Sequence, residues 1–200
     1  MTTLTDEGMD LIFRKARSYN GYQDRPVSEE QLRAIWDLAQ WGPTSANMLP
    51  ARIVWCVSDE AKQRLAACST GTNGEKILKA PVTAILGMDM AFYDQLHKTF
   101  PHTDARSWFM TGEGQPNAPA VEDAAFRNST LQGAYLIIAA RALGLDTGPM
   151  SGIDKDAVDA AFFADTGHRT NFVMTLGYGD PTSIFDRLPR LAFEDVNRIA

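Results

Sequence analysis

The residue types best suited to ligand binding lie in two short polar segments within the first fifty residues. In the first, Arg17 and Ser18 follow a predicted helix, where a planar guanidinium beside a hydroxyl suits hydrogen bonding to a phosphate. In the second, two prolines enclose the segment 43–50, whose hydroxyl and amide side chains suit the edge of a heterocycle. Taken singly, the first is more typical of a solvated helix end and the second of an ordinary loop.

Other motifs that carry chemistry fail on their spacing. Residues 71–76 lack the spacing of a phosphate-binding P-loop, and residues 177–179 lack the third glycine of a dinucleotide fingerprint. Ser151 stands one place too late for a GxSxG nucleophile elbow, so a serine hydrolase is kept only as an alternative. The histidines show no metal-ligand spacing and the cysteines no CxxC motif, so we expect no metal site.

Charge and composition exclude several classes of partner. The chain has 19 Lys and Arg residues against 25 Asp and Glu residues, a formal net charge of -6. Nucleic acids and anionic membranes require a basic face, so we expect neither as a partner. The N-terminal residues are acidic and lack the apolar run of a signal peptide, and no apolar stretch is long enough for a membrane span. We therefore expect a cytoplasmic protein with reduced cysteines.

Periodicity and capping signals predict an α+β protein that forms a single domain over residues 1–200. Ser28 opens a capping box for the second predicted helix. Residues from about 90 to 120, with three prolines in 93–119, indicate an irregular excursion or lid. The predicted helices cover residues 5–16, 28–41, 58–65, 122–143 and 154–163, and the predicted strands residues 53–57, 82–86 and 172–176. Residues 145–152 are predicted to form a glycine-rich turn, and residues 183–200 a polar tail.

The apolar positions predict how these elements pack. Phe13, Trp36 and Phe126 lie on apolar helix faces and are expected in the core. The second half of the helix 122–143 has almost no polar side, and a helix that is apolar all round is buried on all sides. We therefore expect this helix to lie in a core that two subunits share.

Taken together and in order, these segments resemble the nitroreductase family of FMN-dependent oxidoreductases over nearly the whole chain. The resemblance rests on Arg17-Ser18-x-Asn20-x-Tyr22, Trp41-Gly42-Pro43-Thr44-Ser45-Ala46-Asn47-x-x-Pro50, Lys79-Ala80-Pro81, residues 144–152, Gly177-Tyr178-Gly179-Asp180 and Arg187-Leu188-Pro189-Arg190. Two blocks, residues 102–109 and 148–152, are similar to the malonic semialdehyde reductases of uracil breakdown (the RutE type, grouped with HadB-like proteins).

The resemblance implies an α+β homodimer with a central, mostly antiparallel sheet, intertwined helices and two FMN sites at the interface. Residues matching the family's phosphate-binding positions are Arg17, Ser18 and Arg190, with Arg187 as a helper. Ser45 and Asn47 match positions that the partner subunit lends to the flavin, and Pro43 and Thr44 of the same loop are expected to bind the cofactor as well. Residues matching the loop whose backbone N–H approaches flavin N5 are Pro149, Met150, Ser151 and Gly152, where a glycine would permit close approach.

One position departs from the family pattern. Many members carry a second basic residue where this chain has Asn20, and a positive group there would stabilise the reduced flavin. Lys76 matches another family position that reaches the pyrimidine edge of the flavin. We expect Lys76 to supply the charge and Asn20 to act as a neutral hydrogen-bond partner. A solvated loop lysine is the alternative for Lys76.

The implied activity is a hydride relay in which NADPH or NADH reduces FMN and the substrate then accepts hydride from flavin N5. The cofactor carries this chemistry, so we expect no indispensable catalytic side chain. The subgroup resemblance implies malonic semialdehyde (3-oxopropanoate) as substrate, with Arg106 binding its carboxylate. The alternatives are a broad nitroaromatic, quinone or enal reductase, and a flavin-binding protein without turnover.

Overall fold

The computed structural model describes residues 3–200, which are built around a four-stranded antiparallel sheet. Its strands are β1 (Ala51–Cys56), β2 (Val82–Asp89), β3 (Asp146–Met150) and β4 (His168–Gly177), in the order β1-β2-β4-β3. Each neighbouring pair runs antiparallel, with a register shift between Leu86 and Gly87 where β2 meets β4. The two edges of the sheet are therefore β1 and β3.

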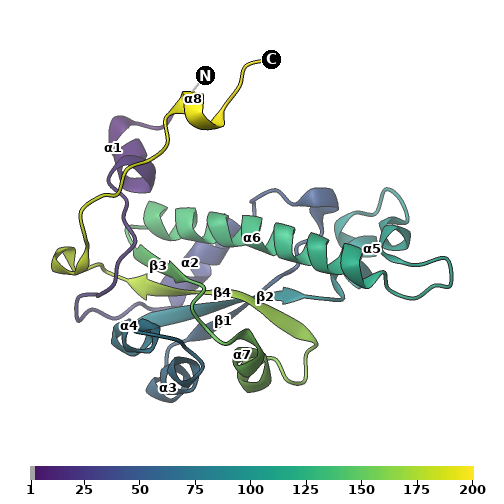
Figure 1. Cartoon of the computed structure of the whole chain (residues 1–200), viewed down its shortest axis with the longest axis horizontal. Coiled ribbons are helices and arrows are strands. Elements are labelled where there is room, and N and C mark those ends of the chain that lie inside the picture. The colour runs from purple at the N-terminus through teal and green to yellow at the C-terminus, as the bar shows by residue number, and fades with distance from the viewer. Residues whose placement is uncertain (1–2) are drawn as a thin grey trace.

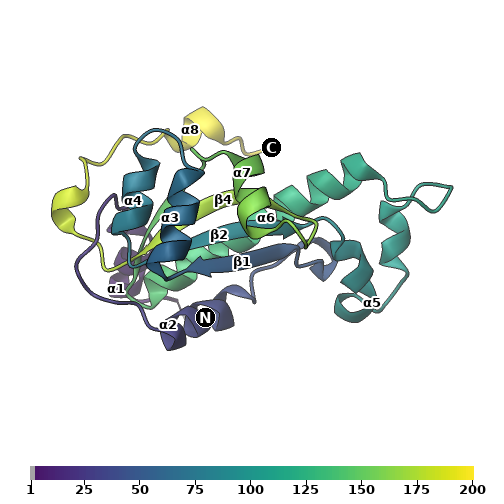
Figure 2. The same cartoon turned by 90° about the horizontal axis from the view of Figure 1, so that it is seen from below.

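Helices cover both faces of this sheet (Figures 1 and 2). The long helix α6 (Ala118–Ala142) crosses one face together with α2 (Glu29–Ala39), and α3 (Asp59–Ala67), α4 (Asn73–Lys79) and α7 (Lys155–Phe162) cover the other. Residues 3–200 also form three short α-helices: α1 (Asp6–Met9), α5 (Leu96–Thr99) and α8 (Phe193–Val196). The arrangement confirms the predicted α+β class.

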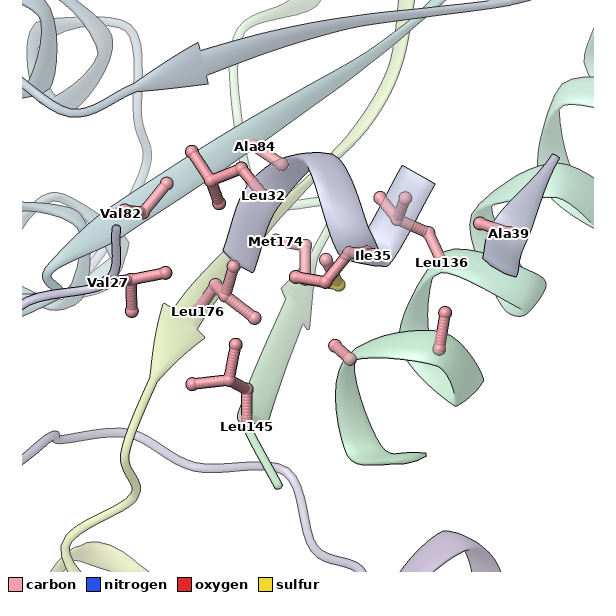
Figure 3. Packing of buried hydrophobic residues seen from close by; sticks show 12 residues of the cluster. Val27, Leu32, Ile35, Ala39, Val82, Ala84, Leu136, Leu145, Met174 and Leu176 are labelled. Carbon is pink, nitrogen blue, oxygen red and sulfur yellow. The ribbon is translucent and has the colours of Figure 1, made fainter. Parts of the chain in front are cut away.

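The core between the sheet, α2 and α6 follows from the alternation of side chains along the strands. Met174 and Leu176 of β4 point to this face and pack against Ile35 of α2 and Leu136 of α6 (Figure 3). Val173, one position away on β4, belongs instead to the cluster under α3, α4 and α7. Because successive side chains of a strand point to opposite faces, β4 contributes to the hydrophobic clusters on both sides of the sheet.

Several local signals form as the sequence predicts. Ser28 and Gln31 make the capping box that begins α2, and Thr5 accepts the Gly8 N–H at the start of α1. The first predicted helix, however, continues only as a π-helical turn at Asp10–Arg14. The sequence predicts no helix over residues 71–76, whereas α4 begins at Asn73.

The prediction of a turn over residues 145–152 is wrong for 146–150, which form the edge strand β3. Gly148 and Pro149 disfavour a strand by propensity, but pairing with β4 overrides them. Pro149 is tolerated because a strand at the edge of a sheet need not donate every N–H to a neighbour.

Residues 92–109 contain short helical turns on an aromatic cluster of their own. Two 3-10 helices, Phe92–Gln95 and Ala105–Phe109, flank α5. Phe92 packs edge-on against Phe109 with ring centroids 4.9 Å apart. This segment extends away from the sheet beside the N-terminal end of α6 (Figure 1). That it acts as a lid stays a prediction.

The predicted core positions Phe13, Trp36 and Phe126 are wrong for the single chain, where they are 54%, 37% and 48% exposed. The outer face of α6 is also apolar and exposed, with Leu131 at 44% and Tyr135 at 37%. These side chains lie on helix surfaces that have no covering element within residues 3–200. Over that same range, no helix has the length and apolar character needed to cross a membrane.

Candidate functional site

Five of the predicted site residues line one cavity of about 520 Å³, which we call the arginine cavity. It lies where the end of the π-helical turn, the last turn of α6 and the C-terminal tail meet. Its lining comprises Phe13, Ala16, Arg17, Ser18, Asn20, Arg141, Phe185, Asp186, Arg187, Leu188 and Arg190. Segments more than 160 residues apart in the sequence thus bring the predicted phosphate-binding residues together.

The edge strand β3 fixes the first of these segments. Ser18 forms an isolated parallel bridge with Thr147, and the Tyr19 N–H donates to the Thr147 carbonyl at 3.0 Å. The close approach depends on Gly148, because a Cβ there would lie 2.4 Å from the Tyr19 carbonyl oxygen. Arg17 and Ser18 are therefore held at the beginning of β3.

The tail is tied to this segment by its arginines. The Arg187 guanidinium donates to the carbonyls of Arg14 and Ala16, both at 2.9 Å. Arg17 in turn donates to the Phe185 carbonyl, and Asn20 donates to the Ser183 carbonyl at 3.2 Å. These bonds to neutral carbonyls fold the tail over the cavity.

Arg141 is a residue of the cavity that the sequence analysis missed. It lies in the last turn of α6 and donates to the Ile12 carbonyl at 3.2 Å, while its Nε is buried without a partner. Burial lowers the pKa of Arg141, the nearby Arg187 lowers it further, and Asp146 opposes both. A signal was available, because Arg141 is the single charged residue between Leu131 and Leu143.

The arginine cavity carries an excess of positive charge. None of the ion pairs found among residues 3–200 involves Arg17, Arg141, Arg187 or Arg190, and Asp186 is the one acidic residue of the lining. Four guanidinium groups without carboxylate partners suit a small dianion such as a phosphate. The same described residues include no cluster of acidic, His and Cys side chains that could hold a metal ion.

The other end of β3 leads to the loop 149–152. Pro149, Met150 and Ser151 line a second cavity of about 350 Å³, whose lining also includes Phe126 of α6 and Lys155 of α7. Pro149 and Ser151 are exposed, so backbone and side chains at this end of the strand are accessible. The edge strand therefore connects the arginine cavity with the loop that the resemblance places near the flavin ring.

The amide of Asn73, at the start of α4, fixes the position of Gly152. Asn73 Nδ2 donates to the Gly152 carbonyl at 3.0 Å, and the Thr70 N–H donates to it at 3.1 Å. A Cβ at position 152 would lie 2.4 Å from Asn73 Nδ2, so the missing side chain makes room for this amide. Lys76 follows Asn73 by three positions on α4 and therefore lies on the same side of the helix. It is half-buried and takes part in none of the ion pairs of the described residues.

The loop 43–50 is rigidly held but lies elsewhere. The Ser45 N–H donates to Asn128 Oδ1 of α6 at 2.8 Å, and Asn47 Nδ2 donates to the Thr99 carbonyl at 2.8 Å. Ala46, Asn47 and Leu49 have positive φ angles of 46°, 48° and 44°, a region that non-glycine residues rarely adopt. The side chains of Ser45 and Asn47 are exposed.

Within one chain, the structure does not bring this loop to the arginine cavity. The loop is anchored at Asn128, and Arg141 follows 13 positions later on α6, which corresponds to about 20 Å along the helix axis. Arg106 lies in the segment 92–109, where it pairs with Asp94 at 2.8 Å. It lines neither the arginine cavity nor the cavity beside Pro149.

Comparisons with known proteins agree with this architecture. The model of the nitroreductase family matches residues 13–178. A protein of Burkholderia lata, named as a candidate NADH dehydrogenase/NAD(P)H nitroreductase, is 55% identical over 199 residues that cover both chains fully. A Ralstonia pickettii protein with the same description and the name HadB is 55% identical over 190 residues, 94% of this chain and 95% of its own.

Solved structures share the fold. A candidate nitroreductase of Exiguobacterium sibiricum, solved in complex with FMN, superimposes with a TM-score of 0.82 at 24% identity. The superposition covers 100% of this chain and 99% of the other. A likeness at this level of identity establishes the architecture alone.

Proposed function

Because the chain belongs to the nitroreductase family, we propose that it is an FMN-dependent NAD(P)H oxidoreductase that acts as a homodimer. The HadB-like branch predicted from the sequence is confirmed by the match to the HadB protein. The observation that carries the proposal is the arginine cavity, in which four guanidinium groups without carboxylate partners face one space.

The residues present fit the chemistry of FMN. Arg17, Arg187 and the Ser18 hydroxyl supply donors for a phosphate at one end of β3, with Arg190 in the tail beside them. The loop 149–152 presents accessible backbone at the other end of the strand. Bound there, FMN would supply hydride transfer between NAD(P)H and an acceptor. Lys76 and Asn20 are proposed to hydrogen-bond the pyrimidine edge of the ring.

Two observations support the homodimer. The loop with Ser45 and Asn47 lies about 20 Å along α6 from the arginine cavity of its own chain, so a site that uses both needs a second copy. In addition, the apolar side chains of Leu131, Tyr135 and Trp41 are exposed, Trp41 to 80%. A second subunit would bury such a surface, as the resemblance implies for the intertwined helices.

For the acceptor, we propose malonic semialdehyde. Its reduction adds a hydride to the aldehyde carbon and a proton to the oxygen, which gives 3-hydroxypropanoate. The HadB-like branch supports this substrate through its similarity to the reductases of pyrimidine degradation. Broad nitroaromatic, quinone or enal reduction is the second candidate, which the nitroreductase names of the relatives favour. Both cysteines are free and buried, which supports a cytoplasmic location.

The first experiment is a visible absorption spectrum of the purified protein before and after anaerobic addition of NADPH. Flavin bands that bleach are the expected result. A colourless protein that also fails to bind added FMN would contradict the proposal. Comparison of kcat/KM for malonic semialdehyde, a nitroaromatic and a quinone then separates the candidate substrates. NADPH oxidation that no acceptor raises above the oxygen background would instead favour a flavin-binding protein without turnover.

A further inference from the structure

We propose that Arg141 binds the phosphate of the flavin and gives the arginine cavity its preference for FMN over riboflavin. The inference rests on the proposed function and deepens it, because no motif of the sequence assigns a role to Arg141. It follows from the helix that anchors Arg141, from the missing hydrogen-bond partner of its Nε, and from the charges around it.

Arg141 has the most rigid anchor of the cavity arginines. It extends from the last turn of the 25-residue helix α6, which packs on the sheet. Arg17 follows an irregular segment, and Arg187 and Arg190 lie in the exposed tail. A guanidinium on a packed helix keeps its position before a ligand arrives, so little conformational entropy is lost when it binds.

The side chain of Arg141 is only partly satisfied. One terminal nitrogen donates to the Ile12 carbonyl at 3.2 Å, whereas Nε is buried and has no hydrogen-bond partner. A buried donor without a partner is costly, and the guanidinium that carries it lines the cavity, where a ligand would supply the acceptor. A guanidinium can offer two parallel N–H groups, which matches a phosphate better than a single carbonyl.

Arg141 takes part in none of the ion pairs of residues 3–200. The negative charge of Asp146 raises the pKa of Arg141. The Asp146 carboxylate, however, accepts the Gly179 N–H at 2.9 Å and forms no ion pair with Arg141. Burial lowers the pKa of Arg141, and the positive charge of Arg187 lowers it further. A buried cation of this kind is stabilised when an anion joins it.

The inference predicts opposite effects on the free and the ligand-bound protein. Removal of the charge in Arg141→Gln should leave the melting temperature of the flavin-free protein unchanged or raised. The same substitution should weaken FMN binding at least tenfold and riboflavin binding less than twofold, because riboflavin lacks the phosphate. Arg141→Lys keeps the charge without the planar guanidinium, so its affinity for FMN should lie between those of Arg141→Gln and the wild type.

The test measures dissociation constants for FMN and riboflavin by quenching of flavin fluorescence, with melting temperatures of the same proteins. Arg127→Gln is the matched control, because Arg127 lies on the same helix in an exposed pair with Asp123. Inorganic phosphate should compete with FMN in the wild type and less in Arg141→Gln.

Each outcome decides between the inference and its alternatives. Equal weakening of FMN and riboflavin in Arg141→Gln would overturn the inference and assign Arg141 a structural role at the Ile12 carbonyl. Unchanged binding of both would overturn it as well. A wild-type protein that binds neither flavin would overturn the proposed function itself, and the inference with it. If Arg141→Gln does not fold, Arg141→Lys gives the same comparison.

Discussion

The arginine cavity and the loop 43–50 are both built from residues that suit a flavin, but one chain completes only the first. The cavity gathers donors from the N-terminal segment, the end of α6 and the tail. The loop is anchored through Asn128 and the Thr99 carbonyl, yet its exposed side chains do not line the arginine cavity of their own chain. On the proposed function, the phosphate site and the loop 149–152 therefore come from one chain, and only the contribution of the loop 43–50 requires a second copy.

The largest effect should come from removing two arginines of the cavity. Charge-assisted hydrogen bonds contribute about 1.5–3 kcal/mol each, so Arg17→Gln with Arg187→Gln should raise the dissociation constant for FMN by about 100-fold or more. Fluorescence titration measures this effect. Arg33→Gln, in an exposed pair with Glu29, is the control. A change below threefold in the double variant would show that the phosphate binds elsewhere.

A mixed dimer tests whether the arginine cavity and the loop 43–50 of one flavin site come from different chains. One chain carries the damaged cavity (Arg17→Gln, Arg187→Gln) and the other the damaged loop (Ser45→Ala, Asn47→Ala). If each site takes its cavity from one chain and its loop from the other, one of the two sites is intact. The expected flavin content is half that of the wild-type dimer. A site completed within one chain would leave both sites damaged, and the flavin content would then fall to that of the single-variant dimers.

How much of this could be predicted depends on whether the signal was local. The capping box at Ser28 and the helix α2 follow from neighbouring residues, so the sequence predicts them correctly. Strand β3 does not, because Gly148 and Pro149 oppose a strand locally and only pairing with β4 and the contact with Tyr19 explain it. The π-helical turn after α1 has no sequence signature.

The same limit applies to the candidate site. The family resemblance identified Arg17, Ser18, Arg187 and Arg190, and the structure places them around one cavity. The sequence analysis missed Arg141 because no binding motif includes it. Its position as the single charged residue between Leu131 and Leu143 was nevertheless visible in the sequence. The distance between the loop 43–50 and the cavity could not be known before the helix α6 was placed.

An intermediate effect is expected at the anchor of the loop. Asn128 is buried, and its side-chain oxygen is the acceptor for the Ser45 N–H. Asn128→Ala leaves that N–H without its partner and should cost about 1–3 kcal/mol of unfolding free energy, measured by urea denaturation. Because the loop would loosen while the arginine cavity stays intact, FMN and riboflavin affinities should fall by the same factor. A loss confined to FMN would contradict the separation of the two regions.

A smaller and more selective effect is expected at Arg106. Its guanidinium is exposed and paired with Asp94. Replacing Asp94 by the carboxylate of the substrate would therefore add only a modest amount of binding free energy. Arg106→Ala should raise KM for malonic semialdehyde by about three- to tenfold and leave KM for an uncharged aldehyde unchanged. Equal KM values for the acid in variant and wild type would remove Arg106 from the substrate site.

The smallest effect concerns Asp146, which is the first residue of β3. Burial raises the pKa of its carboxyl above the usual 3.8, so the ionised form is disfavoured in the folded protein. The loss of folding stability is absent below the usual pKa of 3.8, grows as the pH rises from there to the raised pKa, and is complete above it. Asp146→Asn should therefore stabilise the protein at pH 7, by less than about 1 kcal/mol after allowance for solvent screening, and not at pH 3. The exposed Asp37→Asn is the control, and thermal unfolding across pH measures both. A gain in stability that is equal at both pH values would contradict this account.

The left-handed conformations in the loop 43–50 set which substitutions it can accept. Asn tolerates this backbone region better than most residues and Ala less well, while β-branched residues are barred by their Cβ substituents. Ala46→Gly would remove the steric cost in the folded state but enlarge the set of unfolded conformations, so the two effects oppose each other. Position 46 therefore allows small side chains at little net change, whereas Val, Ile or Thr there would force the loop into another path. Random mutagenesis of these eight residues should thus return few residue types at positions 46, 47 and 49 and more at the exposed positions 43 and 45.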